Sequence, residues 1–275
     1  MSNSSSSMNR LKLSGWKLFI DDGFPVDTLR RLPRGPHFEN VRGPFERVNA
    51  STSARVFRCK IGFAGRPVEL YFKQYLHRSV TDFLKHAFRP SRAVRSLKAA
   101  KMLAEHDLNA PPVVAVGELK LGPFVLENFT FTEAVNHAPD LYEHVQAFAK
   151  SSSHLERRSF IEQLGETIGR MHATNISHGD LRPGNVLARK TDDRWQFFFL
   201  DNERTRKYMR IPRKLILKNL VQINMLHSDV LSSTDRMRFF KAYLRSNPKL
   251  VPERKLIARK SAQRTAERLN KKKHK

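Results

Sequence analysis

Apolar and polar positions divide the chain into a strand-rich first half and a helical second half. Arg55–Ile61 alternates polar and apolar residues, Pro67–Tyr75 carries Val, Leu, Tyr and Phe, and Gly62–Gly65 between them favours a hairpin turn. In Ser91–His106 the apolar residues recur at helical spacing, and Pro111-Pro112 ends that region. Residues 14–50 contain recurrent Gly and Pro, which indicates irregular packing with short strands. The last two strands of the first half are predicted at 113–116 and 124–132.

The second half shows mainly helical spacing. The strongest pattern lies in Glu156–Ala173. Its apolar face consists of Phe160, Ile161, Leu164, Ile168 and Met171. A polar loop, Asn175–Asn185, follows, and two short apolar segments after it bracket a turn as a hairpin does. The other predicted elements are helices at 140–149, 214–227 and 235–246 and hairpin strands at 186–188 and 195–200.

Composition makes the chain globular and strongly basic. At 275 residues, with 40% hydrophobic residues and 19 Phe, the chain can bury a sizeable core. Its 51 Lys and Arg against 26 Asp and Glu give a net charge of +25, which attracts nucleic acid, an anionic membrane surface or phosphorylated substrates. Nucleic acid is the least favoured partner, because no aromatic-interleaved basic strand or zinc framework accompanies the charge.

Cysteine content and hydropathy exclude other classes. Cys59 is the only cysteine, so the chain cannot build a disulfide framework. No apolar run approaches the roughly 20 residues that span a bilayer. We therefore expect a protein of the reducing cytoplasm, peripheral at the inner face of the cytoplasmic membrane.

The segment Ile176–Leu187 contains the residue types that phosphoryl transfer from ATP requires. Such transfer needs metal ions that neutralise the phosphates, a cation that holds them, and a carboxylate that orients the attacking hydroxyl. Asp180, in His178-Gly179-Asp180, is the candidate catalytic base, and Asn185, five residues later, is the candidate metal ligand. Arg182 or a nearby cation can steady the γ-phosphate.

A second carboxylate follows on the next strand. The apolar run Phe197–Leu200 ends in Asp201, which places an acid at a strand end, as a magnesium ligand requires. The joint pattern of helix, His-x-Asp, Asn, hairpin, strand and Asp is much more restrictive than any of its parts. The alternative is an ordinary polar loop in which Asp180 and Asn185 cap turns.

This pattern resembles the eukaryotic-type kinase superfamily and, within it, the bacterial lipopolysaccharide core kinases, which phosphorylate Kdo or heptose sugars. The similarity covers about Ala50–Leu244. Asp201–Arg204 resembles that family's Asp-x-x-Arg version of the metal-binding loop. The other segments that carry the resemblance are Ser91–Ala93, Leu108–Pro112, Phe131–Ala134 and Ser233–Leu244.

The resemblance implies an α+β, two-lobed, protein-kinase-like fold, with a small β-rich N-lobe that has one main helix and a mainly helical C-lobe. The corresponding boundaries are a disordered Ser-rich tail at 1–13, the nucleotide-binding N-lobe at 14–133, the catalytic and acceptor-binding C-lobe at 134–250, and a basic tail at 251–275. That tail is either a basic amphipathic helix or a solvated segment.

By position in the family pattern, Lys73 matches the strand lysine that contacts the α- and β-phosphates. The loop over the nucleotide corresponds to Ser51, Thr52 and Ser53, although it lacks the glycine-rich pattern. Glu133 and Val135 would flank the adenine through the hinge backbone. With ATP and Mg2+ as the implied cofactors, the metal ligands would be Asn185 and Asp201.

One position departs from the family pattern. The first-lobe helix of these kinases offers a glutamate to the strand lysine, and Ser96 stands at that place. Either Asp82 or Glu105 substitutes for it, or the ion pair is absent.

We therefore expect an ATP-dependent kinase that phosphorylates Kdo or heptose of the lipopolysaccharide inner core, with an anionic glycolipid acceptor. The basic stretch from Arg204 to Lys218 is either a cradle for this acceptor or a solvated face. The alternatives are a protein or small-molecule kinase of the same fold, or a non-catalytic nucleotide-binding scaffold.

Overall fold

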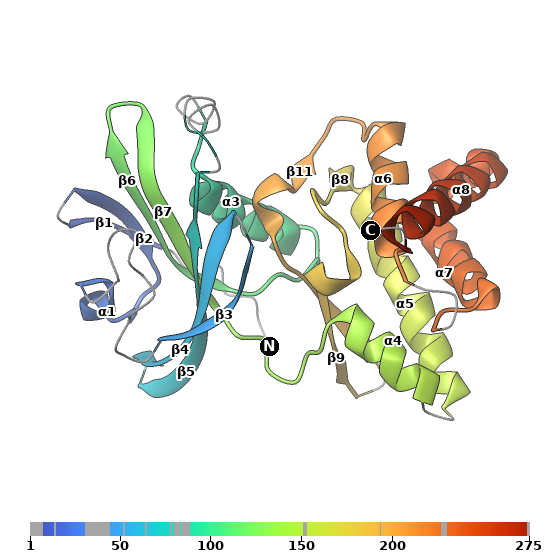
Figure 1. Ribbon diagram of the computed structural model, residues 1–275, viewed down its shortest axis with the longest axis horizontal. Coiled ribbons are helices and arrows are strands. Elements are labelled where there is room, and N and C mark those ends of the chain that lie inside the picture. Colours follow the sequence, from blue (N-terminus) through green and yellow to red (C-terminus); the bar gives the residue numbers. More distant parts are fainter. Residues whose placement is uncertain are drawn as a thin grey trace. The chain divides into compact units, whose positions relative to one another are not determined.

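The computed structural model describes residues 8–13, 15–30, 45–51, 53–63, 65–77, 79, 83, 89–150, 153–192, 194–226 and 230–273. The chain divides into two compact units. Unit 1 comprises residues 1–98 and 111–134, and unit 2 comprises residues 99–110 and 135–275. Strands dominate unit 1 and helices dominate unit 2 (Figure 1).

Unit 1 is built on one antiparallel sheet of seven strands in the order β1-β2-β6-β7-β5-β4-β3 (Figure 1). The strands are β1 (Asn9–Leu13), β2 (Trp16–Ile20), β3 (Phe45–Ser51), β4 (Ala54–Phe63), β5 (Arg66–Tyr75), β6 (Val113–Leu121) and β7 (Phe124–Glu133). The four strands predicted from the sequence lie within β4 to β7, so these predictions are confirmed. A short helix, α1 (Val26–Arg30), follows β2.

Alternation along the strands gives the sheet two different faces. One face carries a cluster of buried aromatic rings, because every second residue of a strand points the same way. These rings are Phe57, Phe72, Phe129 and Phe131. On the other face, Ala93 of helix α3 (Arg92–Ala104) packs with Tyr75 and Val116. The helix predicted at residues 91–106 is therefore confirmed.

The N-terminal segment corrects one prediction. Residues 9–13, which we expected in a disordered tail, form β1 and pair with β2 in an antiparallel register that sets Leu11 opposite Leu18. Leu13 packs against the core of unit 1, so an apolar contact and a ladder of backbone hydrogen bonds hold this segment in place. Residues 1–7 lie outside the described residues.

Unit 2 is built around helix α5 (His154–Ala173). Its core contains Phe160, Ile168 and Met171, together with Phe197 and Tyr243 from other elements. The remaining elements are α4 (Leu141–Lys150), β8 (Ile176–Ser177), η2 (Pro183–Asn185), β9 (Val186–Thr191), β10 (Arg194–Phe199), η3 (Asn202–Arg204), β11 (Arg206–Lys207), α6 (Arg213–Ile223), α7 (Ser233–Arg245), η4 (Pro248–Glu253) and α8 (Arg254–Lys273). The predicted helices and the β9–β10 hairpin are thus present, although α6 ends at Ile223 and His227 lies outside the described residues.

Close backbone approach joins α5 to α7. A Cβ atom at Gly169 would lie 2.5 Å from the carbonyl oxygen of Tyr243, and Gly165 faces the carbonyl of Phe239 in the same way. Ser232 and Asp235 form a capping box at the start of α7, and Arg157 of α5 binds the Asp235 carboxylate at 2.5 Å. Helices α5 and α7 are therefore held tightly together.

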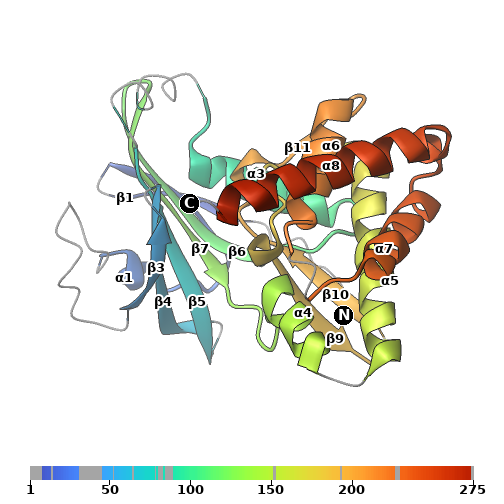
Figure 2. The same cartoon turned by 45° about the vertical axis from the view of Figure 1, so that its right-hand side comes forward.

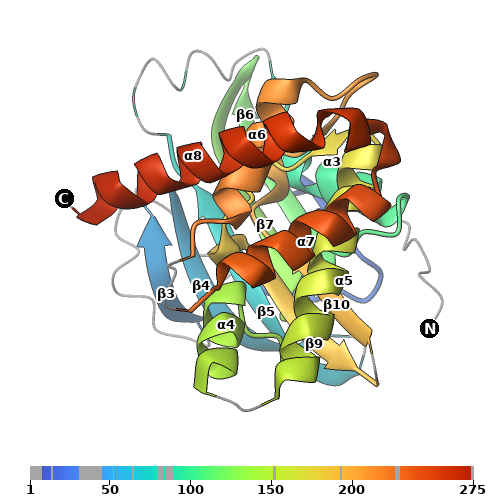
Figure 3. The same ribbon diagram turned by 90° about the vertical axis from the view of Figure 1, so that its right-hand side faces the viewer.

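The C-terminal segment is helical. Of the two alternatives for residues 251–275, the structure shows the helix, with α8 packed on α6 (Figures 2 and 3). Ile257 and Thr265 are buried on its inner side, whereas most of its Lys and Arg side chains are exposed.

Among the described residues, no helix combines the length and the apolar character that crossing a bilayer requires.

Candidate active site

Two short strand pairs hold the predicted catalytic loop. β8 pairs with β11 at its start, where Ser177 lies opposite Arg206, and β9 pairs with β10 at its end, where Val186 lies opposite Phe199. The loop at 178–185 and the segment at 200–205 are therefore each enclosed between the same two pairs. Backbone pairing alone therefore brings the segments that carry Asp180 and Asp201 to one place.

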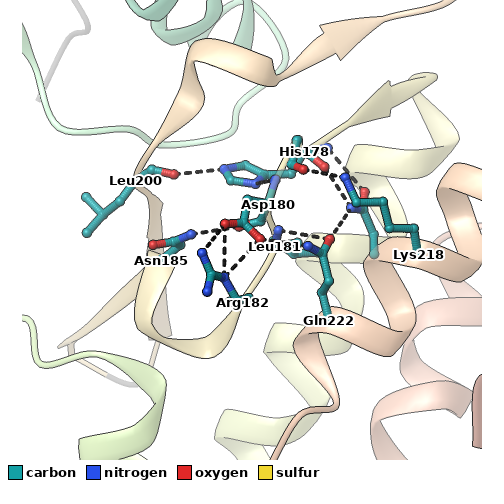
Figure 4. Close-up of polar contacts among 10 residues, drawn as sticks. His178, Asp180, Leu181, Arg182, Asn185, Leu200, Lys218 and Gln222 are labelled. Atoms are coloured by element: carbon teal, nitrogen blue, oxygen red, sulfur yellow. Dashed lines mark hydrogen bonds and ion pairs between the residues drawn. The ribbon is translucent and has the colours of Figure 1, made fainter. Parts of the chain in front are cut away.

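His178 joins the loop to the segment after β10. Its side chain is fully buried, and its Nδ1 accepts a hydrogen bond from the backbone N–H of Asp180 at 3.1 Å. Nε2 therefore carries the proton and donates to the carbonyl of Leu200 at 2.9 Å (Figure 4). It also donates to Asn202 Oδ1 at 3.1 Å. Burial lowers the pKa of His178, so the ring is neutral and acts as a structural bridge.

The carboxylate of Asp180 is held in a defined orientation. Gln222 Nε2 donates to its Oδ1 at 2.7 Å, and the Arg182 guanidinium binds it through Nε, at 3.0 and 2.9 Å, and through Nη2 at 2.5 Å (Figure 4). The hydrogen bond to Asp180 is the largest cause that raises the pKa of Arg182. The structure thus places the Arg182 guanidinium on Asp180, the predicted base. The contact of Arg182 with the γ-phosphate stays a prediction.

Asn185 and Asp201 lie at the open end of the β9–β10 hairpin. Asn185 directly precedes β9, and Asp201 comes two residues after β10. The Asn185 amide nitrogen donates to the carbonyl of Asp180 at 2.8 Å, which leaves the amide oxygen to act as a ligand. The Leu200 N–H donates to the Asn185 carbonyl at 2.9 Å, and Asp201 is the next residue. Asp201 adopts a left-handed conformation with φ of 60°, which Asp tolerates better than most residues.

These two residues fit a magnesium ion. Mg2+ prefers oxygen ligands and is usually held by one or two carboxylates together with substrate phosphates. One amide oxygen and one carboxylate match that requirement. In the described part of the chain, no group of three or more His, Cys, Asp or Glu side chains offers an all-protein metal cage.

Gly179 permits the close approach of the loop and the Asp201 segment. A Cβ atom at Gly179 would overlap the Arg204 side chain and lie 2.8 Å from the Arg204 backbone carbon. Only glycine therefore fits between Asp180 and His178, and this residue fixes the distance between the two segments.

Helix α6 supplies three residues to the site: Lys218, which belongs to the predicted basic stretch, and Asn219 and Gln222, which the sequence alone did not reveal as site residues. Gln222 orients Asp180, Asn219 accepts the backbone N–H of His178 at 3.2 Å, and Lys218 donates to the carbonyl of Gly179 at 2.6 Å. Asn219 and Gln222 are buried although the helix is otherwise apolar on this side. Buried polar residues at the spacing i, i+3 on an amphipathic helix are the pattern that could have identified them.

Unit 1 groups the residues predicted to bind the phosphates. Lys73 lies on β5 between Val56 of β4 and Thr130 of β7, and its ammonium sits 5.2 Å from the centroid of the Tyr75 ring. Arg92 of α3 stacks on the same ring and donates to the carbonyl of Ser53 at 2.7 Å. Ser51 ends β3, and Thr52 lies outside the described residues.

The predicted hinge residues follow β7. The backbone N–H of Glu133 donates to the carbonyl of Pro112 at 2.9 Å, so this donor is already used. Burial is the largest cause that raises the pKa of Glu133, which is half-buried. Val135 is the first residue of the second part of unit 2, directly after the unit boundary. Their roles toward adenine stay predictions.

The structure describes Ser96, which stands at the place of the family's helix glutamate, and one of the two residues proposed to substitute for that glutamate. Ser96 is half-buried on α3, Glu105 lies beyond the last residue of that helix and is exposed, and Asp82 lies outside the described residues. Glu118 of β6, which we did not single out, is 2% exposed. It lies on the same face of the sheet as Lys73, because Asn128 pairs with both Glu118 and Tyr75.

The basic stretch after Asp201 is not one surface. Lys218 lies against Gly179, Arg213 pairs with Glu253, and Lys207 contacts His106 at 2.9 Å. Arg206, Arg210 and Lys214 are exposed. Only part of this stretch therefore faces the candidate site.

Comparison with known proteins identifies the class. One solved structure, of WaaP in complex with acyl carrier protein, has a TM-score of 0.62 with 17% sequence identity, and the match covers 81% of this chain and 88% of that chain. This similarity shows a kinase-like fold of the WaaP type and confirms the predicted fold class. Among curated proteins, none matches the sequence.

The family follows from the sequence itself. A family model described as "Lipopolysaccharide kinase (Kdo/WaaP) family" matches residues 45–243. The chain therefore belongs to the lipopolysaccharide kinase (Kdo/WaaP) family, as the resemblance predicts. Membership in a kinase family supports phosphotransferase activity and implies the use of ATP.

Proposed function

We propose that this protein transfers the γ-phosphoryl group of ATP to a hydroxyl of Kdo or heptose in the lipopolysaccharide inner core. The observation that carries the proposal is the fixed Asp180 carboxylate. Gln222 and Arg182 orient it, and the loop that bears it is bonded to the segment that bears Asp201. Family membership supports a sugar acceptor.

In this mechanism Asp180 binds the attacking hydroxyl and takes its proton. The hydroxyl oxygen forms a bond to the γ-phosphorus, the bond between that phosphorus and the β–γ bridging oxygen breaks, and ADP leaves. Asn185 and Asp201 would hold Mg2+, which neutralises phosphate charge when bound. Lys73 would hold the α- and β-phosphates, and Arg182 would pass from Asp180 toward the transferred group.

The test is an acceptor comparison with γ-labelled ATP and Mg2+. We expect label on deacylated inner-core oligosaccharide, at a site that mass spectrometry can locate on Kdo or heptose, and none on a mixture of unrelated proteins. Label on protein alone would favour a protein kinase, and the absence of both transfer and ATP hydrolysis would favour a non-catalytic scaffold.

We also propose a peripheral position at an anionic membrane surface. The net charge of +25 and the exposed cations of α8 support it, because each basic residue near such a surface adds about 1 kcal/mol of attraction. Sedimentation with phosphatidylglycerol vesicles at low salt, and not with phosphatidylcholine vesicles, is the expected result. Equal sedimentation with both would contradict the proposal.

A protein partner is a further proposal. The similar solved structure is of WaaP with an acyl carrier protein, and the fold match to it covers 81% of this chain. We propose that this chain binds an acyl carrier protein as well, aided by its positive charge. Co-elution of the two purified proteins in size-exclusion chromatography tests this, and separate elution at micromolar concentrations would contradict it.

A further inference from the structure

Helix α8 packs on α6, a helix of the candidate active site, although α8 lies outside the residues that match the family model. Figures 2 and 3 show it crossing α6, the helix that supplies Lys218 and Gln222 to the site, and the two helices are in contact. Residues at four-residue spacing form its inner side, and they are Ile257, Ser261, Thr265 and Leu269, all buried or half-buried. The helix is therefore docked in a fixed orientation.

Arg268 stands at the edge of this inner side. It precedes Leu269 and is exposed. Its charge, with those of Arg204 and Asp180, acts on the ammonium of Lys218. Cations from three separate segments thus come together, namely the Asp201 segment, α6 and α8.

Two of these cations, Lys218 and Arg204, lie against the backbone of Gly179, next to Asp180. Lys218 donates to the carbonyl of Gly179 at 2.6 Å, and Gly179 also touches Arg204. Burial is the largest cause that lowers the pKa of Lys218. Arg204 and Arg268 lower it further, whereas Asp180 raises it. Lys218 is therefore within electrostatic reach of Arg204 and Arg268 as well as of Asp180.

The positive charge of this cluster is not balanced. In the described parts of the chain, neither Arg204 nor Arg268 is part of an ion pair, and the Asp180 carboxylate is already bound by Arg182 and Gln222. Like charges gathered beside a half-buried ammonium are unfavourable, and a bound anion removes that cost. Guanidinium groups match carboxylate and phosphate oxygens especially well.

The position of the cluster separates it from the predicted metal ligands. Figure 4 shows Asn185 and Lys218 on opposite sides of Asp180. Asn185 marks the side on which magnesium and the nucleotide phosphates would bind. The cluster lies on the other side, where the second substrate must approach for in-line transfer.

We propose that Arg268, together with Arg204 and Lys218, binds an anionic group of the acceptor and so places its hydroxyl at Asp180. This inference rests on the proposed function. It assigns to α8 a role in acceptor recognition: a carboxylate or phosphate on the sugar is held on one side of the base while the nucleotide is held on the other. Arg268 is then an acceptor-binding residue and does not contact the nucleotide.

The test compares Arg268→Ala with Arg259→Ala. Arg259 lies nine residues earlier on α8, about 180° around the helix at about 100° per residue, and is also exposed. Both variants remove one positive charge from the same helix. The acceptor is deacylated inner-core oligosaccharide, used without membranes so that attraction to a lipid surface does not contribute. Each protein is also assayed with the same oligosaccharide after chemical reduction of its carboxylates to alcohols.

For Arg268→Ala we expect the KM for the native oligosaccharide to rise about tenfold, as the loss of a charge-assisted hydrogen bond predicts. The KM for ATP is expected to stay within about twofold, and Arg259→Ala to match the wild type. With the carboxyl-reduced oligosaccharide the wild type and Arg268→Ala should have the same KM, because the partner of Arg268 is then missing. If the difference persists, a phosphate on the oligosaccharide is the partner, and phosphatase treatment should remove it.

Two different failures are distinguishable. Normal transfer with equal acceptor KM in the wild type and Arg268→Ala would overturn this inference and leave the proposed function standing. An equal rise of KM in Arg259→Ala would also overturn it, because general charge would then explain the effect. Absence of transfer by the wild type would overturn the proposed function and this inference with it.

Discussion

The loop at residues 178–185 places Arg182 on Asp180, and helix α8 places the Arg268 charge within reach of Lys218, but different forces hold the two segments in place. The loop is fixed by directed hydrogen bonds, such as those of His178 to Leu200 and of Gln222 to Asp180. Helix α8 is fixed by a narrow stripe of buried side chains that includes Ile257. The comparison teaches that the loop is sensitive to substitution where it approaches the Arg204 backbone at Gly179, whereas α8 is sensitive mainly along its buried stripe.

Among the variants that test this comparison, the largest expected effect is steric and lies in the loop. Gly179→Ala places a methyl group against the Arg204 backbone, which must move and carry Asp201 with it. We expect phosphoryl transfer to fall about 100-fold, because a shift of about 1 Å at a catalytic group has that effect. Steady-state transfer assays measure the change.

Gly184→Ala is the matched control in the same loop. A Cβ atom there would have its nearest neighbour at 3.6 Å, an ordinary contact. Transfer within about threefold of the wild type is expected. If both variants lost activity equally, the close approach of Gly179 to Arg204 would not be the cause.

The next effect concerns the stripe of α8. Ile257 is 2% exposed, so Ile257→Ala removes a packed side chain and should lower the free energy of unfolding by about 2–3 kcal/mol. Leu256, its neighbour, is 40% exposed, and Leu256→Ala should change that free energy by less than about 0.5 kcal/mol. Urea denaturation measures both. Equal small effects would mean that α8 is not docked in solution.

The smallest expected effect is a pH dependence of the free energy of unfolding, which arises from the buried His172. His172 contacts the Tyr243 hydroxyl and Asn219, and burial lowers its pKa from 6.5 to about 4. Because the folded pKa lies below the unfolded one, His172 stabilises the fold above pH 6.5, and this contribution is lost as the pH falls toward 4. Between pH 7 and pH 5 we expect a loss of about 2 kcal/mol from this group.

The matched variant isolates that group from the carboxylates and from His178. His172→Gln should make the free energy of unfolding less dependent on pH over the same range, by about 2 kcal/mol. Urea denaturation at both pH values measures it. An unchanged pH dependence would contradict the assignment.

The sequence predicted the acid and the amide of the loop because their spacing lies within one local element. Asp180 and Asn185 are five residues apart, and the apolar hairpin strands that follow determine where Asp201 lies. The strands β4 to β7 were predictable for the same reason, since alternation is a local pattern.

Contacts between distant segments could not be predicted in this way. Gln222 is 42 residues from Asp180 in the sequence, and nothing in α6 alone indicates its partner. Helix α8 has so few buried side chains that its sequence allows either a helix or a solvated tail. The role we propose for Arg268 depends on the packing of α8 on α6 and on the effect of the Arg268 charge on Lys218, and neither can be derived from the local sequence.

The central claim is that Asp180 takes the proton of the acceptor hydroxyl. The most direct test is single-turnover transfer from γ-labelled ATP to inner-core oligosaccharide by Asp180→Asn, which keeps the shape of the side chain. The account predicts that ATP binding stays close to that of the wild type while the rate of transfer falls by about a thousandfold. Transfer at the wild-type rate would contradict it.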